Sequence, residues 1–102
     1  MRRLSPTLVA VLHSVTDGVE YGFDIIDHTG LPSGTVYPAL SRLERDGFVK
    51  STWEDEATAF REGRPARRCY RITAPGARAL AEAFAHYRSL LPSRPARARR
   101  SS

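Results

Sequence analysis

Apolar residues recur at helical spacing in two short stretches at the start of the chain. The first stretch predicts a helix from Pro6 to about Thr16, with Ser5 as N-cap and proline at the position where its missing N–H costs nothing. The second predicts a helix over about 22–29, ended by Gly30 in the left-handed conformation. Apolar residues occupy more than one side of the first helix, which predicts burial on two sides. They are Leu8, Val9, Val11, Leu12 and Val15.

A third helix is predicted directly after the tight turn of Leu31 and Pro32, with Ser33 as its N-cap. Successive helical residues lie about 100° apart, so apolar and polar positions separate into two faces. The predicted core face consists of Val36, Ala39, Leu40, Leu43 and Gly47. The other face and its flanks carry hydroxyls, an aromatic ring and two arginines, in Gly34, Thr35, Tyr37, Pro38, Ser41, Arg42 and Arg45.

The pattern changes to a period of two after the third helix, which predicts a β-hairpin. On the first strand Val49, Ser51 and Trp53 alternate with polar residues, and residues 68–72 alternate likewise on the second. The residues between them, 56–66, include a glycine and a proline and are predicted to form a mobile tip. The hairpin should therefore form a wing beside the third helix.

Residues 74–91 are predicted to form a last helix, with Thr73 as N-cap. Its apolar side chains recur at spacings of four, three and four, and such a seam needs a partner. It could fold back on its own domain, but we favour a two-fold dimer in which the seam meets the first helix. The predicted dimer contacts are Leu8, Leu12, Leu80, Phe84, Tyr87 and Leu91. The remaining residues, 92–102, are predicted to be a disordered basic tail.

The length of 102 residues allows one compact domain. We predict a mainly α fold with a small β-hairpin, in which residues 1–73 form a winged helix-turn-helix domain and 74–91 a dimerisation helix. No run approaches the roughly 20 apolar residues of a membrane span, so no membrane partner is expected. The single cysteine, Cys69, is read as a small buried hydrophobe, and a reducing cytoplasm is the predicted location.

Basic residues are concentrated in the second half of the chain. The net charge is +5; residues 1–60 carry five basic and nine acidic side chains, whereas 61–102 carry eleven and two. Fifteen of the sixteen basic residues are arginines, whose guanidinium groups bind phosphates and carboxylates in a bidentate manner. Together with the polar third helix, this charge predicts double-stranded DNA as the partner.

The arginines of the predicted wing are candidates for phosphate contacts. Arg64, at the tip, is also placed to enter a minor groove. The alternative is pairing within the hairpin, because it also carries four carboxylates; that alternative is weaker for Arg64 than for Arg67 or Arg68. Tyr21 and Gly22 open the second helix, where an exposed amide could contact a phosphate. The wing arginines are Arg61, Arg64, Arg67 and Arg68, and the carboxylates are Glu54, Asp55, Glu56 and Glu62.

The chain resembles the PadR family of bacterial transcriptional regulators. The matching segments include YGFDII at 21–26, SGTVYPAL at 33–40, GRP at 63–65 and YRIT at 70–73. The resemblance covers about residues 5–90 and is closest to the shorter branch, which has a single C-terminal helix. It implies a winged-helix homodimer that represses promoters, and we expect a palindromic operator with half-sites about one helical turn, or a multiple, apart. In some members a small-molecule inducer releases the DNA, so an effector is a further expected partner, with the least support.

Other functions have less support in the sequence. His13, His28 and His86 are far apart and have no further ligand at metal-binding spacing, and no nucleophile stands beside a base. We therefore predict neither an enzyme nor a cofactor. Trp53 could line a ligand pocket, but core closure is favoured. The alternatives to a sequence-specific regulator are an architectural DNA-binding protein without sequence preference and a winged-helix module that binds another protein.

Overall fold

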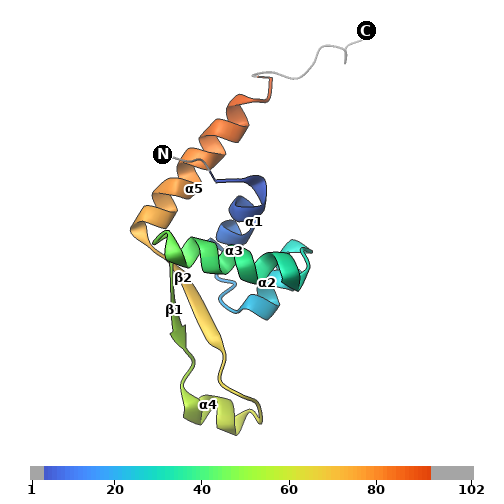
Figure 1. Ribbon diagram of the computed structural model, residues 1–102, viewed down its shortest axis with the longest axis vertical. Helices are drawn as coiled ribbons and strands as arrows, with labels where there is room; N and C mark the ends of the chain where they lie inside the picture. The colour runs from blue at the N-terminus through green and yellow to red at the C-terminus, as the bar shows by residue number, and fades with distance from the viewer. Residues whose placement is uncertain (1–3, 93–102) are drawn as a thin grey trace.

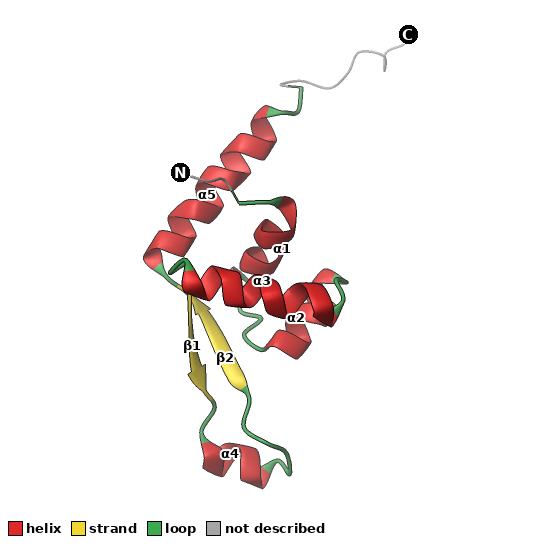
Figure 2. Cartoon of the chain, viewed as in Figure 1, coloured by secondary structure: helices red, strands yellow, loops and turns green. Residues whose placement is uncertain are grey.

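A computed structural model describes residues 4–92 of the protein. Within this range the chain folds into five helices and a two-stranded antiparallel sheet, in an order that places three helices before the hairpin and one after it (Figures 1 and 2). The helices are α1 (Pro6–Thr16), α2 (Gly22–Thr29), α3 (Ser33–Arg45), α4 (Glu56–Arg61) and α5 (Ala74–Ser89), and the strands are β1 (Val49–Trp53) and β2 (Arg68–Ile72).

Local capping signals set most helix ends where the sequence places them. The Ser5 hydroxyl accepts a hydrogen bond from the Leu8 amide (3.3 Å), and Gly30 ends α2 with a φ of 76°. The start of α3 differs by one residue, because Pro32 is the N-cap and Ser33 is already helical. The far end of α3 was also predicted wrongly: Gly47 lies beyond the helix in an exposed turn, with a φ of 81°, and does not join the core face.

The core lies between the first three helices, the base of the hairpin and the first half of α5. The predicted core face of α3 is confirmed at its four apolar positions, since Val36, Ala39, Leu40 and Leu43 are all buried. They meet Val11 and Leu12 of α1 and Ile25 of α2, which have no exposed surface. Burying side chains of this size stabilises the fold by roughly 1.5–3 kcal/mol each, which fixes the orientation of α3.

The hairpin forms the predicted wing, but its tip contains the short helix α4. Val49 pairs with Ile72 and Trp53 with Arg68 in the antiparallel register. At the tip, the Asp55 carboxylate accepts a hydrogen bond from the Thr58 amide (3.1 Å), and Ala59 is buried. The sequence predicted a mobile tip over residues 56–66, and the structure shows that its first part, Glu56–Arg61, is helical. An N-cap and a good helix-forming segment order the residues that precede the glycine and proline.

The last helix packs against its own domain with a face of small residues. Gly76, Ala79, Leu80 and Ala83 are buried, and the Tyr87 hydroxyl donates a hydrogen bond to the Leu4 carbonyl oxygen (2.8 Å). Figure 1 shows α5 extending away from the base of the wing, past α1. The sequence placed Leu80 in a seam for a partner, and that part of the prediction is wrong: the side chain is 6% exposed and belongs to the core.

The dimer contacts that the sequence predicted on α1 are also partly wrong. Leu12 has no exposed surface, so it cannot contact a second chain as predicted. Leu8 is partly buried against the core. Of the predicted contacts on α5 and just beyond it, Phe84 (38%) and Leu91 (66%) keep the largest exposed fractions. A surface for a partner is thus restricted to the outer sides of α1 and α5.

Candidate nucleic-acid interface

Helix α3 presents a polar surface on the side opposite the core. The helix is anchored by its buried apolar face, so the orientation of the polar side chains is set by packing rather than by their own contacts. Residues of this surface lie within four turns of one helix, a length that suits a DNA major groove. The exposed members are Ser33, Gly34, Tyr37, Pro38, Ser41 and Arg45, and Thr35 and Arg42 are partly buried.

The two arginines of α3 differ in their surroundings. Arg42 lies one turn before Asp46, and its Nε is 3.5 Å from a carboxylate oxygen of that residue. Arg45 is exposed and has no acidic side chain within ion-pair distance in the part of the chain that the structure describes. An exposed ion pair such as Arg42–Asp46 contributes little, but it partly neutralises Arg42. Arg45 is therefore the α3 arginine most available to an anionic partner.

In the wing, Glu54 holds two arginines, and we call this group of Glu54, Arg64 and Arg67 the Glu54 clasp. Arg64 donates two parallel hydrogen bonds to the carboxylate, one of them 2.8 Å long. The carboxylate also accepts from the backbone amide of Arg67 (3.2 Å) and lies 3.5 Å from its guanidinium. The Glu54 side chain is only 8% exposed. The clasp thus ties β1 to the chain that leads into β2.

The clasp changes the interpretation of Arg64. The hydrogen bonds and charge of the Arg64 guanidinium lower the pKa of Glu54 to about 2. Arg64 also lies 3.7 Å from Glu62, so its charge is balanced within the wing. The prediction of an Arg64 side chain free to enter a minor groove is therefore wrong for this structure. Pairing within the hairpin, the weaker alternative on sequence grounds, is the arrangement that forms.

We expect the clasp to give the fold a specific pH dependence. A carboxylate whose pKa falls from 4.5 to about 2 on folding stabilises the native state above pH 4.5, and this contribution is lost as the pH falls toward 2. Glu54→Gln should therefore lower the melting temperature at pH 7 and leave it nearly unchanged at pH 2. Circular dichroism melts between pH 7 and 2 provide the measurement, with Glu82→Gln on the exposed side of α5 as control. If the melting temperatures of wild type and Glu54→Gln differed by the same amount at every pH, the proposed role of the clasp would be contradicted.

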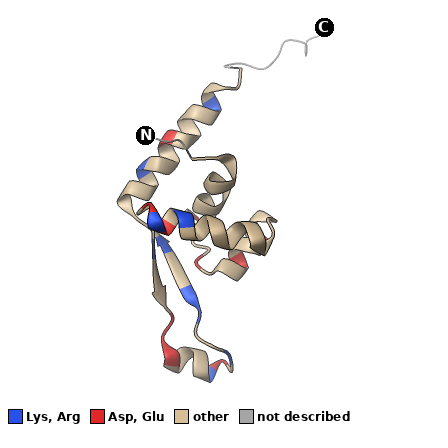
Figure 3. Ribbon diagram, in the orientation of Figure 1, with Lys and Arg blue, Asp and Glu red and all other residues tan. Residues whose placement is uncertain are grey.

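The wing tip is acidic rather than basic. Residues 54–64 contain four acidic residues and two arginines, and the ribbon at the start of α4 is red, the colour of Asp and Glu, in Figure 3. Glu54 belongs to the clasp, and Asp55 is the N-cap of α4, so both carboxylates stabilise the fold of the wing. Arg61 is exposed and donates a 3.4 Å hydrogen bond to Thr58. The positive charge of the wing is instead carried by its strands, where Lys50, Arg68 and Arg71 are exposed.

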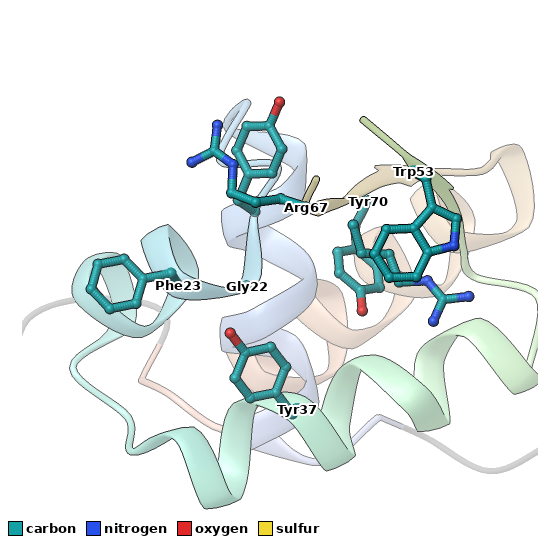
Figure 4. Close-up of a pocket in the computed structure, with 8 residues that line it drawn as sticks. Gly22, Phe23, Tyr37, Trp53, Arg67 and Tyr70 are labelled. Carbon is teal, nitrogen blue, oxygen red and sulfur yellow. The ribbon is translucent and has the colours of Figure 1, made fainter. Parts of the chain in front are cut away.

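A cleft separates α3 from the wing, and we call it the aromatic cleft. Its walls are rings from α2, α3 and both strands, bordered by two arginines (Figure 4). Tyr37 of α3 faces the wing side chains across the cleft in this view. The cleft encloses about 320 Å³. The rings belong to Tyr21, Phe23, Tyr37, Trp53 and Tyr70, and the arginines are Arg67 and Arg68.

Two predictions change at the aromatic cleft. Trp53 does not close the core: its side chain is 65% exposed, and the Arg68 guanidinium lies 5.2 Å from its ring centre. Gly22 is buried against the ring of Tyr37, so the prediction of an exposed amide at this position is wrong. A Cβ on Gly22 would overlap that ring, so a larger residue at this position would require the exposed Tyr37 side chain to move. Tyr21 is half-buried, with the Arg67 guanidinium 3.8 Å from its ring centre.

The remaining chemical groups serve the fold. Cys69 is buried as predicted, its thiol lies 3.2 Å from a Glu20 carboxylate oxygen, and burial raises its pKa. Nδ1 of His28 lies 2.8 Å from the hydroxyl of the buried Ser14. Among residues 4–92 no three potential ligands gather into a metal site. None of the helices described is long and apolar enough to cross a membrane.

Three packed helices, a following two-stranded wing and an outward polar face on the third helix define the protein as a winged helix-turn-helix regulator of transcription. The family model described as "Transcriptional regulator PadR-like family" matches residues 11–82. The chain belongs to this family, as its motifs predicted.

Solved structures agree with this assignment. A PadR-like transcription factor from Bacteroides fragilis is similar at 25% identity and a TM-score of 0.69, covering 81% of each chain. A PadR family regulator from Eggerthella lenta shares 26% identity at a TM-score of 0.63, covering 78% of this chain and 72% of that one. A PadR family regulator from Clostridium difficile has the same fold at 24% identity and a TM-score of 0.67, with coverages of 81% and 88%. Among curated proteins, no sequence matches significantly.

Proposed function

We propose that the protein is a homodimeric, cytoplasmic repressor that binds a palindromic DNA operator through α3 and the wing. The observation that carries this proposal is the outward polar face of α3. Six of its residues are exposed on a helix whose opposite side is packed against the core, and Arg45 among them has no carboxylate within ion-pair distance among residues 4–92. A helix held this firmly can place side chains on base edges with the geometry that sequence readout needs.

The wing adds contacts to the phosphate backbone in this proposal. Lys50, Arg68 and Arg71 supply exposed positive charge along the strands. We expect the acidic tip to lie away from the duplex, because its carboxylates would repel the phosphates. Arg67 is fixed by the clasp and by Tyr21, so it sets the position of the wing and contributes less charge. Phosphate contacts fix the orientation of the protein on DNA, and α3 supplies the sequence preference.

Selection from a random duplex library tests the proposal. The bound sequences should converge on two half-sites in inverted repeat, centred about 10 base pairs, or a multiple, apart. If the protein retained duplexes from the library but their sequences did not converge, the result would favour an architectural protein that binds through phosphates alone. A protein that retains no duplex at low salt would instead fit an interaction module, whose acidic wing tip and exposed Phe60 would face a protein partner.

The homodimer in this proposal uses the outer sides of α1 and α5. Phe84 of α5 is 38% exposed, and its ring makes an edge contact with His13 of α1 at 5.5 Å between centres. The two side chains join the helices into one surface, which Leu8 and Val9 extend as partly buried residues. A two-fold dimer through this surface would present two copies of α3 to one face of a duplex.

We expect Phe84→Asp to convert the dimer to a monomer, because a carboxylate at the centre of a dimer contact would lose its hydration. Light scattering after size exclusion gives the mass. Phe60→Asp is the matched control, since Phe60 is 85% exposed but lies on the wing tip. A dimer mass that survives Phe84→Asp, with unchanged dissociation on dilution, would remove this surface from the proposal.

A further inference from the structure

A chain of hydrogen bonds joins the end of α3 to both strands of the wing, and we call its members, Glu44, Ser51 and Arg68, the Glu44 network. The Ser51 hydroxyl on β1 donates to a carboxylate oxygen of Glu44 on α3 (2.6 Å). The same hydroxyl accepts a hydrogen bond from the Nε–H of Arg68 on β2 (3.0 Å). A carboxylate only accepts, and a hydroxyl has a single proton. Glu44 therefore takes the proton of Ser51 and leaves the lone pairs of that oxygen to Arg68.

The network holds the Arg68 guanidinium at one edge and leaves the other edge open. Ser51 engages its Nε–H, and its central carbon lies 5.2 Å from the ring centre of Trp53, within the range of a cation–π contact. Among residues 4–92 the two terminal amino groups of Arg68 have no hydrogen-bond acceptor, and no carboxylate lies within ion-pair distance. These amino groups form a fork that suits a phosphate. Arg68 is thus oriented by the protein at the edge that a phosphate does not need.

Arg68 also lies on the face of the wing toward α3. It pairs with Trp53 in the antiparallel register, and both residues line the aromatic cleft that α3 borders (Figure 4). Lys50 and Arg71 pair with each other at a position of the alternate set, so they point to the opposite face of the sheet. Of the three basic residues on the described strands, Arg68 is therefore the one that shares a face with α3.

We propose that Glu44 is a positioning residue for DNA binding, which holds Arg68 through Ser51 so that the open amino groups meet a phosphate of the duplex bound by α3. An arginine side chain loses rotamer freedom when it binds, and a side chain that is already held loses less. Because Glu44 belongs to α3, the network also sets this phosphate contact relative to the base contacts of the helix. The DNA contact rests on the proposed function, whereas the hold of Glu44 on Arg68 does not.

The negative charge of Glu44 separates this proposal from simple electrostatics. Removing a carboxylate beside a DNA-binding surface should by itself strengthen binding, because it removes a repulsion of the phosphates. We expect the opposite for Glu44→Ala, a loss of about fivefold in duplex affinity, because Ser51 loses the acceptor that orients it. Glu44→Gln removes the charge but keeps an acceptor oxygen, so it should bind at least as tightly as wild type. Fluorescence anisotropy with the duplex selected from the library measures these affinities.

A double-mutant cycle tests whether Glu44 acts through Arg68. Arg68→Gln should weaken duplex binding about tenfold, and adding Glu44→Ala to it should cause no further loss. Ser51→Ala should lose as much affinity as Glu44→Ala, and it keeps the test decisive if a thermal melt shows that Glu44→Ala does not fold. Glu82→Ala, which removes an exposed carboxylate from α5, is the matched control and should bind no more weakly than wild type.

Two results of the cycle would overturn the proposal. The first is an affinity of Glu44→Ala and Ser51→Ala that equals or exceeds that of wild type. The second is a double variant whose loss equals the product of the losses of Glu44→Ala and Arg68→Gln, because Glu44 would then act independently of Arg68.

Proton exchange at Arg68 tests the network without DNA. The Nε–H signal of Arg68 in a nitrogen–proton NMR spectrum is identified by its absence from the spectrum of Arg68→Gln. Its exchange with water should be faster in Glu44→Ala and Ser51→Ala than in wild type and Glu44→Gln. Equal exchange rates in all four proteins would overturn the positioning role. If the rates follow the expected order but wild type binds no duplex, the proposed function and the DNA contact fail, whereas the hold of Glu44 on Arg68 stands.

Discussion

Replacing Arg45 with glutamate is expected to weaken binding to the selected operator by about 100-fold. A bidentate contact from arginine to a guanine edge supplies about 1–3 kcal/mol of discrimination, and a carboxylate at the same place also repels the phosphates. Arg45 is exposed at the end of α3 and has no acidic partner in the described structure, so the change removes no internal contact that would confuse the result. Fluorescence anisotropy with the operator duplex measures the effect.

The matched control is Arg88→Glu, in the last turn of α5. It changes the net charge by the same amount at the end of a helix that extends away from α3 (Figure 1). The control should cost no more than a few-fold in affinity, the part that arises from net charge alone. If Arg45→Glu and Arg88→Glu lost the same affinity for the operator, Arg45 would act only through the overall electrostatic field of the protein. A second comparison, Arg45→Ala on operator and shuffled duplexes, distinguishes a base contact from a phosphate contact.

Gly76→Ala is expected to lower the free energy of unfolding by about 3 kcal/mol, at the upper end for overpacking a core. Gly76 lies in the first turn of α5, and an added Cβ would overlap the carbonyl oxygen of Phe48. That oxygen is backbone, and it already accepts a hydrogen bond from the Thr73 amide (3.1 Å), so it cannot move away freely. The base of the wing and the start of α5 would have to separate. Urea denaturation measures the change.

Gly34→Ala is the same substitution in the first turn of α3 and serves as control. An added Cβ at this position would have no atom within 4 Å, and the residue does not have a positive φ. Alanine restricts the unfolded chain more than glycine does, so this variant should be unchanged or more stable by up to about 1 kcal/mol. If Gly76→Ala were as stable as Gly34→Ala, close packing at the junction of wing and α5 would be refuted.

The sequence predicts the parts of this fold that depend on local signals. The helix starts at Ser5 and Thr73, the αL glycine at Gly30 and the four apolar positions of α3 are all visible as patterns within a few residues. Such patterns also separate the two faces of α3, because its apolar and polar positions follow one helical period. The candidate site on α3 could therefore be predicted without tertiary information.

The errors concern residues whose role depends on neighbours distant in sequence. Arg64 is bound by Glu54 ten residues away, and the hairpin register that brings them together is not encoded by either residue alone. Leu80 and Phe84 belong to the same apolar seam in the sequence. The direction from which α1 packs against α5 buries Leu80 and leaves Phe84 partly exposed. Trp53 follows the strand alternation but lies beyond the end of the core, where alternation no longer means burial.

The most direct test of the central claim is a titration of a labelled duplex from upstream of the gene and of a shuffled duplex with the same composition, by fluorescence anisotropy at several salt concentrations. We expect a preference of about a thousandfold or more for the upstream duplex at physiological salt, the range typical of specific regulators. The affinity for both duplexes should fall as salt rises, because phosphate contacts release counterions. If both duplexes, and the operator selected from the library, were bound equally at every salt concentration, sequence-specific recognition by α3 would be contradicted.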